Sequence, residues 1–460
     1  MQYTNQNISL SLIKNMGYFV VILLTLLQLI GYFINDSIPY TTVAVTSMII
    51  PFRFLYLLKF RDISTNMSRF WQWSFWDMSS IVLMILLFDR FASYVSPGMT
   101  IAFTPQDIQF SILTGCSALI IHFFVSFWWN ANSVQTYDYV PSSLRTWVML
   151  FIAYLIVFVI AAVLSKIYGL SVFGGEGHQL PFKISGIVNF IVFYGTPFFV
   201  FFIMDGANKL NIHTVVTTLL VLFVAMISGY CTYSKAALIL PFVYYCLYMV
   251  FRRTISVRFI SIALILALSL FYIASFFMSY RDSLTSIRVA SFKELQSSYS
   301  VLDYVSRMCQ DGIVLAKFHS SIPIDQIGAI MEHYNYNPAL IHTRVIDRIP
   351  EGRMHSSGAT PFAAFYCLGY KGMFFGFFMM SIITTLIDCY LPRCKGVIGS
   401  SFVRAFFSIY VTVFLMQELF YQVIMAFIGR HYVIAVTQGC LFTLVILYVK
   451  LFYVRVPIQK

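Results

Sequence analysis

Apolar runs of about twenty residues recur along the 460-residue chain and are separated by short polar turns. A run of this length can cross the hydrocarbon core of a bilayer as one helix. A membrane β-barrel would need shorter segments of alternating polarity instead. The pattern therefore predicts an all-α polytopic membrane protein with about twelve transmembrane helices. The predicted spans cover residues 16–33, 41–58, 75–88, 110–129, 147–164, 187–204, 215–228, 236–251, 259–278, 373–391, 402–420 and a last run that ends at 450.

The pattern breaks once, between Tyr280 and Thr360, where polar residues gather before the apolar runs resume. We therefore expect nine spans in residues 1–279, one large loop in residues 280–370 and three further spans in residues 371–460. The basic and imidazole side chains of the polar stretch are Arg281, Arg288, Arg307, Arg344, Arg348, Arg353, His319, His333, His342 and His355.

The charge distribution predicts which side of the membrane each connection occupies. Charged residues make up only 10% of the chain, yet its formal net charge is +12. Much of the positive charge lies in short connections, which is the mark of the cytoplasmic side and gives no reason to expect a nucleic-acid partner. Both termini are then cytoplasmic, and the large loop lies on the outer side. The marking residues are Lys59, Arg61, Arg69, Arg252, Arg253, Arg258, Arg393 and Lys395.

Motifs for nucleotide chemistry are absent from the sequence. It contains no phosphate-binding loop, no dinucleotide fingerprint, no HExxH and no GxSxG. The eight cysteines lack the spacing of a metal site, so we expect neither a metal nor another cofactor. Chemistry on the outer side would therefore have to use a substrate that is already activated.

Three cations lie at the expected outer mouths of two spans. Lys235 begins the eighth span, and Arg281 follows the ninth. Arg288 comes seven residues after Arg281, which places both on one face if the segment is helical. Such cations can converge at the level of the lipid headgroups, where a diphosphate is a natural ligand for them.

Three further arginines follow later in the loop. Arg344 and Arg348 are four residues apart and would share a helix face, while Arg353 lies on a turn after Pro350 and Gly352. The alternative for every one of these cations is a surface ion pair with one of the loop's own acidic residues.

Two residues are candidates for proton transfer. Glu418 lies near the outer end of the eleventh predicted span, where an ionisable side chain is a functional hypothesis by default. The alternative is an interfacial carboxylate that faces water. His355 follows Arg353 on the same turn of the loop.

Other ionisable residues in or beside the spans favour a structural interpretation. Asp77 and Asp205 lie at the expected cytoplasmic ends of their spans. His122 and His213 are interpreted as packed helix residues rather than as ligands.

The chain resembles the Wzy-type O-antigen polymerases of bacterial envelopes. The resemblance rests on about a dozen spans, cytoplasmic termini and one large arginine-rich outer loop late in the chain. Ser234-Lys235-Ala236-Ala237-Leu238 is similar to the family's entry into a span from outside. The stretch from His355 to Gly372 is similar to the exit from its large loop. The resemblance implies a fold like that of the C-type membrane glycosyltransferases.

The resemblance also implies an activity, a partner and a location. Such enzymes transfer a glycan from undecaprenyl diphosphate to the non-reducing end of another lipid-linked repeat unit. They work without metal at the periplasmic face of the bacterial inner (cytoplasmic) membrane. The expected partners are the undecaprenyl-diphosphate-linked oligosaccharide and membrane lipids. A chain-length regulator, a Wzz-type co-polymerase, is a partner that the sequence leaves open.

The resemblance assigns roles to the candidate residues. Lys235, Arg281 and Arg288 would hold the donor diphosphate and offset the charge that develops on it. Arg344, Arg348 and Arg353 would bind the acceptor or the second phosphate group. His355 or Glu418 would be the general base for the attacking sugar hydroxyl.

Two other functions fit many of the same features. An O-antigen ligase would share the fold, the lipid donor and the loop but transfer the glycan to the lipid A core. A lipid-linked oligosaccharide flippase would share the partner and the spans, but it should carry charges inside a central cavity and needs no large outer loop.

Overall fold

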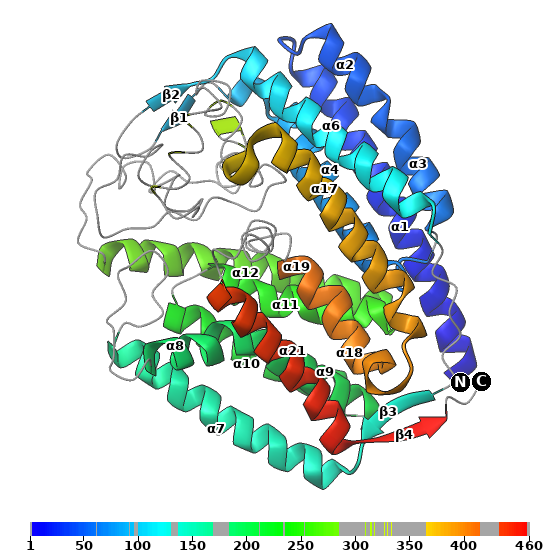
Figure 1. The fold of residues 1–460 in the computed structure, drawn as a ribbon, viewed down its shortest axis with the longest axis vertical. Coiled ribbons are helices and arrows are strands. Elements are labelled where there is room, and N and C mark those ends of the chain that lie inside the picture. The colour runs from blue at the N-terminus through cyan, green and yellow to red at the C-terminus, as the bar shows by residue number, and fades with distance from the viewer. Residues whose placement is uncertain are drawn as a thin grey trace.

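The structure is a computed structural model of the chain. It describes residues 2–60, 62–91, 93–95, 100–129, 137–168, 184–210, 212–232, 235–252, 254–284, 365–414 and 432–457, together with single residues between 309 and 333. These residues form a bundle of long helices with two small two-stranded sheets (Figure 1). The protein is therefore an all-α polytopic membrane protein in its main architecture.

The first helix group is built from the N-terminal part of the chain. The segment that contains the third predicted span is not one regular helix, because a π-helical turn separates two α-helical pieces. The elements are α1 (Gln2–Ile34), α2 (Tyr40–Ser47), α3 (Ile49–Lys59), α4 (Met67–Asp77), the π-turn η1 (Met78–Val82), α5 (Leu83–Leu86), the 3-10 turn η2 (Phe88–Arg90), β1 (Ser93–Val95), β2 (Thr100–Ala102) and α6 (Pro105–Phe127).

The second helix group follows a short strand and holds most of the remaining crossings. Its elements are β3 (Tyr137–Pro141), α7 (Leu144–Tyr168), α8 (Ile184–Asn189), the π-turn η4 (Phe190–Tyr194), α9 (Gly195–Lys209), α10 (Thr214–Thr232), α11 (Lys235–Phe251), α12 (Val257–Leu284), α18 (Ser401–Ala405), the π-turn η9 (Phe406–Val411), α19 (Thr412–Phe414), α21 (Tyr432–Phe452) and β4 (Tyr453–Pro457).

One helix from the C-terminal part of the chain joins the first group. This helix, α17 (Phe365–Cys389), packs against α4 and α6, and Figure 1 shows it lying along α6. The 3-10 turns η7 (Leu391–Arg393) and η8 (Gly396–Gly399) then lead to α18 in the second group. The chain after the large loop therefore connects the two groups.

The two ends of the bundle differ in composition. Both chain termini lie together at one end, beside the antiparallel pair of β3 and β4 (Figure 1). Lys59, Arg252, Arg393 and Arg455 also belong to this end, which we call the basic end. At the opposite end lie the β1–β2 hairpin and the last residues of α12, and we call it the loop end.

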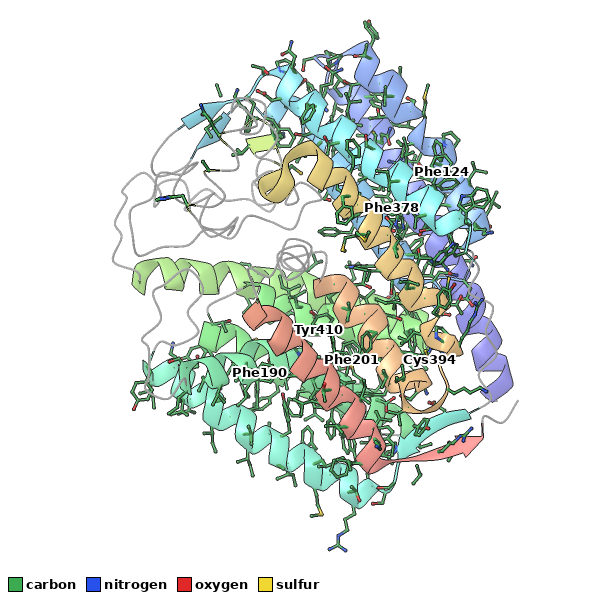
Figure 2. The ribbon with its side chains drawn as sticks, viewed as in Figure 1. Phe124, Phe190, Phe201, Phe378, Cys394 and Tyr410 are labelled. Atoms are coloured by element: carbon green, nitrogen blue, oxygen red, sulfur yellow. The ribbon has the colours of Figure 1, made fainter. Side chains whose placement is uncertain are left out.

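The outer surface of the bundle is apolar, as contact with lipid tails requires. Figure 2 labels Phe124 and Phe378, whose side chains are 53% and 45% exposed on two packed helices. Phe201 and Tyr410, labelled in the same view, are buried between the helices of the second group. Large apolar side chains thus occupy both the interior and the surface, which is typical of a membrane bundle and atypical of a soluble one.

Seven helices among the described residues are long and apolar enough to cross a membrane. They coincide with the first, second, fourth, fifth, sixth, seventh and tenth predicted spans. Shorter apolar helices occupy the positions of the eighth, ninth, eleventh and twelfth. The total of about twelve spans stays a prediction.

Three helix boundaries near the predicted third span and the large loop differ clearly from those expected. The third crossing begins at Met67 rather than near Phe75, because Arg69 lies inside the helix and not in front of it. At the large loop, α12 continues to Leu284 and α17 already begins at Phe365.

Candidate functional site

The sequence-predicted site falls largely outside the described residues. Lys235 is the first residue of α11, and Arg281 lies in the last turn of α12, so both stand at the loop end. The other six candidates are outside the described residues: Arg288, Arg344, Arg348, Arg353, His355 and Glu418. The structure therefore leaves the grouping of the eight residues untested.

Lys235 and Arg281 belong to neighbouring helices of unequal length. The chain runs down α11 to Phe251, turns, and returns along α12 from Val257. At 1.5 Å per residue, Lys235 lies about 24 Å from that turn and Arg281 about 36 Å. Arg281 therefore stands about 12 Å further out along the helix axis than Lys235 if the two helices are straight. The two cations therefore start from backbone positions at different depths along the bundle.

A few described residues of the large loop also lie at the loop end. The Lys317 ammonium lies 2.9 Å from the Asp107 carboxylate, which belongs to the first turn of α6. The same ammonium donates a hydrogen bond to the carbonyl of Ala102 at 2.6 Å. The loop therefore contacts the first helix group at the same end as Lys235 and Arg281.

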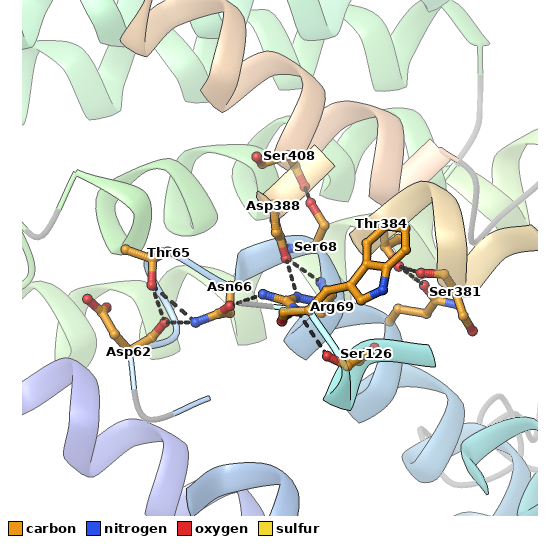
Figure 3. Close-up of polar contacts among 12 residues, drawn as sticks. Asp62, Thr65, Asn66, Ser68, Arg69, Ser126, Ser381, Thr384, Asp388 and Ser408 are labelled. Carbon is orange, nitrogen blue, oxygen red and sulfur yellow. Dashed lines mark hydrogen bonds and ion pairs between the residues drawn. The ribbon is translucent and has the colours of Figure 1, made fainter. Parts of the chain in front are cut away.

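A closed polar cluster occupies the basic end, around the Asp388 carboxylate of α17 (Figure 3). It accepts the backbone N–H groups of Ser68 at 3.2 Å and Arg69 at 2.9 Å, in the first turn of α4. These N–H groups have no partner within their own helix, and the positive helix end favours an anion. Asp388 therefore caps α4 from a helix that follows it by more than three hundred residues.

The Arg69 guanidinium completes this cluster and is itself fully buried. Its Nε lies 3.5 Å from Asp388, and its terminal nitrogens donate to the carbonyls of Ser126 and Trp129 and to the Asn66 side chain. The Phe60 ring lies beneath it, 4.4 Å from the guanidinium carbon. One arginine thus connects α4, α6 and α17.

His122 of α6 extends the same cluster into the bundle. Its Nε2 lies 3.1 Å from both the Tyr56 hydroxyl and the Arg69 carbonyl, and its Nδ1 lies 3.1 Å from the Ser381 hydroxyl. The imidazole is fully buried. His122 is therefore a packed helix residue, as the sequence predicts, whereas the same prediction is wrong for His213, which is exposed and precedes the first residue of α10.

A second buried ion pair lies deeper in the first helix group. Arg53 of α3 donates two hydrogen bonds of 2.6 Å to the two carboxylate oxygens of Asp77, and neither side chain is exposed. Asp77 follows Met67 by ten residues, about 15 Å along the helix. The expectation that Asp77 lies at a cytoplasmic span end is wrong, because the helix starts earlier and Arg53 neutralises the carboxylate inside the bundle.

A third buried carboxylate, Asp205, fastens the C-terminal strand to the second helix group. It accepts the hydroxyls of Tyr248 at 2.9 Å and Tyr453 at 2.8 Å. Burial and the nearby carboxylate raise the pKa of the Tyr453 phenol well above its usual value of 10, so the phenol keeps its proton for this bond. Asp205 is therefore structural, as expected from its place at a span end.

The partners in these clusters do not follow from the predicted spans. Asp388 lies inside the predicted span 373–391, and an ionisable residue inside a span is the signal that could have identified it. Its partner Arg69 was counted as a flank, because the start of α4 was placed too late. The paired and fully enclosed side chains are suited to holding helices together rather than to contacting a substrate.

Comparisons with known proteins add no relative: no protein-family model, no curated protein and no solved structure matches this chain.

Proposed function

We propose that the protein is an O-antigen polymerase that transfers an undecaprenyl-diphosphate-linked glycan to the non-reducing end of another lipid-linked repeat unit. The observation that carries this proposal is the long cation-rich connection between α12 and α17, which contacts the loop end of a polytopic bundle. Lys59, Arg252, Arg393 and Arg455 belong to the opposite end. The proposed chemistry then lies at the periplasmic face of the bacterial inner membrane.

The roles of the candidate residues follow from the charge of the leaving group. Lys235, Arg281 and Arg288 would hold the donor diphosphate, and a guanidinium can bind two phosphate oxygens at once. Cations placed there offset the negative charge that grows on the diphosphate as the glycosidic bond breaks. The sugar is already activated by the lipid diphosphate, so this reaction needs no nucleotide. Arg344, Arg348 and Arg353 are proposed for the acceptor side.

The proton of the attacking sugar hydroxyl needs an acceptor. Glu418 and His355 remain the two proposed general bases. The buried carboxylates of the first helix group do not suit this role, because Asp77 and Asp388 are at most 2% exposed and are already paired with arginines. The same burial weakens the flippase alternative, whose charges should face an open cavity.

Lipopolysaccharide banding from a strain that lacks the protein tests the proposal. A polymerase is supported by loss of the long ladder while one repeat unit stays attached to the core. Loss of all O-antigen from the core would indicate the ligase or the flippase instead. A normal ladder would exclude all three functions.

Replacement of single cations tests the site assignment in the same strain. Arg281→Ala should shorten or abolish the ladder, because it removes a cation from the proposed diphosphate site. Arg90→Ala is the matched control, since Arg90 is an exposed arginine at the loop end of the first helix group. Both variants are compared at equal protein level in the membrane. A wild-type ladder from Arg281→Ala contradicts the assignment of Arg281.

A further inference from the structure

We propose that Cys309, Ile313, Val314 and Lys317 form an anchor that holds the large loop against the first helix group, with Lys317 as a positioning residue. The inference rests on the proposed function for its effect on glycan chain length. The existence of the anchor is independent of that function. We call these four residues the anchor.

The four anchor residues lie close together in the chain. Each of them has helical backbone, and Cys309 and Lys317 are eight residues apart. The contacts described for these residues therefore come from one short segment of the loop.

The apolar part of the anchor is buried in the main core. Cys309, Ile313 and Val314 are each at most 1% exposed and belong to the same apolar cluster as the helices of the first group. The Cys309 sulfur lies 3.8 Å from the carbonyl of Ser79 in η1. Burial of these three apolar side chains stabilises the contact between the loop and the first helix group.

The polar part of the anchor lies at the N-terminus of α6. A cation is unfavourable near the positive end of a helix unless an anion accompanies it. Here one carboxylate oxygen of Asp107 accepts the Thr104 backbone N–H, the Thr104 hydroxyl and the Lys317 ammonium at 2.8, 2.8 and 2.9 Å. Asp107, the N3 residue of the capping box whose N-cap is Thr104, is thus the residue that binds the loop.

The anchor stands between the two proposed groups of cations along the chain. Arg281 and Arg288 precede it, and Arg344 to Arg353 follow it. The anchor divides the connection between α12 and α17 into two shorter segments, residues 285–308 and 318–364. A shorter segment loses less conformational entropy when both of its ends are fixed. The anchor therefore shortens the length of chain between a fixed point at the loop end and each group of cations.

The anchor is tested with Cys309 as a reporter thiol. The protein is prepared with its other cysteines replaced, in native membranes, and the rate of maleimide labelling of Cys309 is measured. Because the side chain is 1% exposed, labelling should be much slower than in denaturant-unfolded protein. Labelling of the native protein at the unfolded rate would overturn the anchor.

Substitution of Lys317 tests its positioning role. Lys317→Glu places two carboxylates together and should speed labelling roughly ten- to a hundredfold, as expected for loss of a charge-assisted hydrogen bond. Asp107→Asn keeps an acceptor for the Thr104 cap but loses the charge, so it should give a smaller increase. Arg90→Glu, a charge reversal on an exposed residue at the same end, should label at the native rate.

The same strains are then compared by their lipopolysaccharide ladders at equal protein level. Lys317→Glu should shift the ladder to fewer repeat units, while Arg90→Glu should leave it unchanged. An unchanged labelling rate in Lys317→Glu would overturn the role of Lys317 in the anchor. Faster labelling with a normal ladder would overturn its positioning role. A normal ladder from the strain without the protein would refute the proposed function alone, since labelling measures the anchor without reference to any glycan.

Discussion

Replacement of Asp388 tests how much its buried ion pair with Arg69 stabilises the bundle. Asp388→Asn keeps the shape of the side chain and one acceptor oxygen but removes the charge. The Arg69 guanidinium, which is 0% exposed, would then be a buried cation without a counter-charge. The second backbone N–H of the α4 N-terminus would also lose its acceptor.

The free energy of unfolding should fall by about 3 kcal/mol, because removal of one partner from a buried ion pair typically costs about 3 to 5 kcal/mol. The lower end of that range applies, since Arg69 keeps its hydrogen bonds to Ser126, Trp129 and Asn66. Arg69→Met together with Asp388→Asn leaves no uncompensated charge. The double variant should therefore be more stable than the sum of the single effects, by about 2 kcal/mol.

Unfolding in mixed detergent micelles, followed by Trp fluorescence, measures these differences. Asp138→Asn is the matched control, because the Asp138–Arg252 pair is 3.7 Å long and its side chains are 18% and 24% exposed. That control should change stability by about 1 kcal/mol or less. A loss below about 1 kcal/mol for Asp388→Asn, or additive effects in the double variant, would refute the reasoning.

Two further predictions concern the second helix group. Gly206→Ala should destabilise the protein by about 1 to 3 kcal/mol, because its Cβ would lie 1.8 Å from the Trp147 indole nitrogen. Alanine normally favours a helix, so this loss would come from the contact alone. Gly186→Ala is the control: no atom lies within 4 Å of its Cβ, and it should be neutral or slightly stabilising in the same unfolding assay. Tyr453→Phe removes one hydrogen bond to the buried Asp205 carboxylate and should lower stability by about 1.5 to 3 kcal/mol, and stability within error of wild type would contradict that contact.

The hydrophobic pattern located most of the helices because span length and lipid contact act locally. The helix α7, for example, is apolar along most of its length, and many of its large apolar side chains, such as Met149, Ile156 and Ile160, are exposed. The third crossing was misplaced for the opposite reason. Arg69 and Asp77 would mark a span boundary if their charges were exposed to water. In the structure they are buried and form ion pairs with Asp388 and Arg53, respectively.

The hydrophobic pattern does not predict which distant segments of the chain contact each other. Nothing in the local sequence of α4 indicates that its N-terminus is capped by a carboxylate from α17. The candidate site likewise depends on contacts between segments that are distant in the sequence. The sequence nominated cations on three separate segments, and the structure describes the backbone position of only Lys235 and Arg281 among them. Their convergence on one diphosphate stays a prediction.

The hydrogen bond between Tyr453 of β4 and Asp205 of α9 can form only late in synthesis. Tyr453 follows Asp205 by 248 residues, so at ordinary translation rates α9 emerges roughly 12 to 50 s before its tyrosine partner. The second helix group is therefore inserted with Asp205 incompletely satisfied until Tyr453 has been synthesised. A nascent chain stalled before β4 should be more sensitive to membrane proteases than the finished protein.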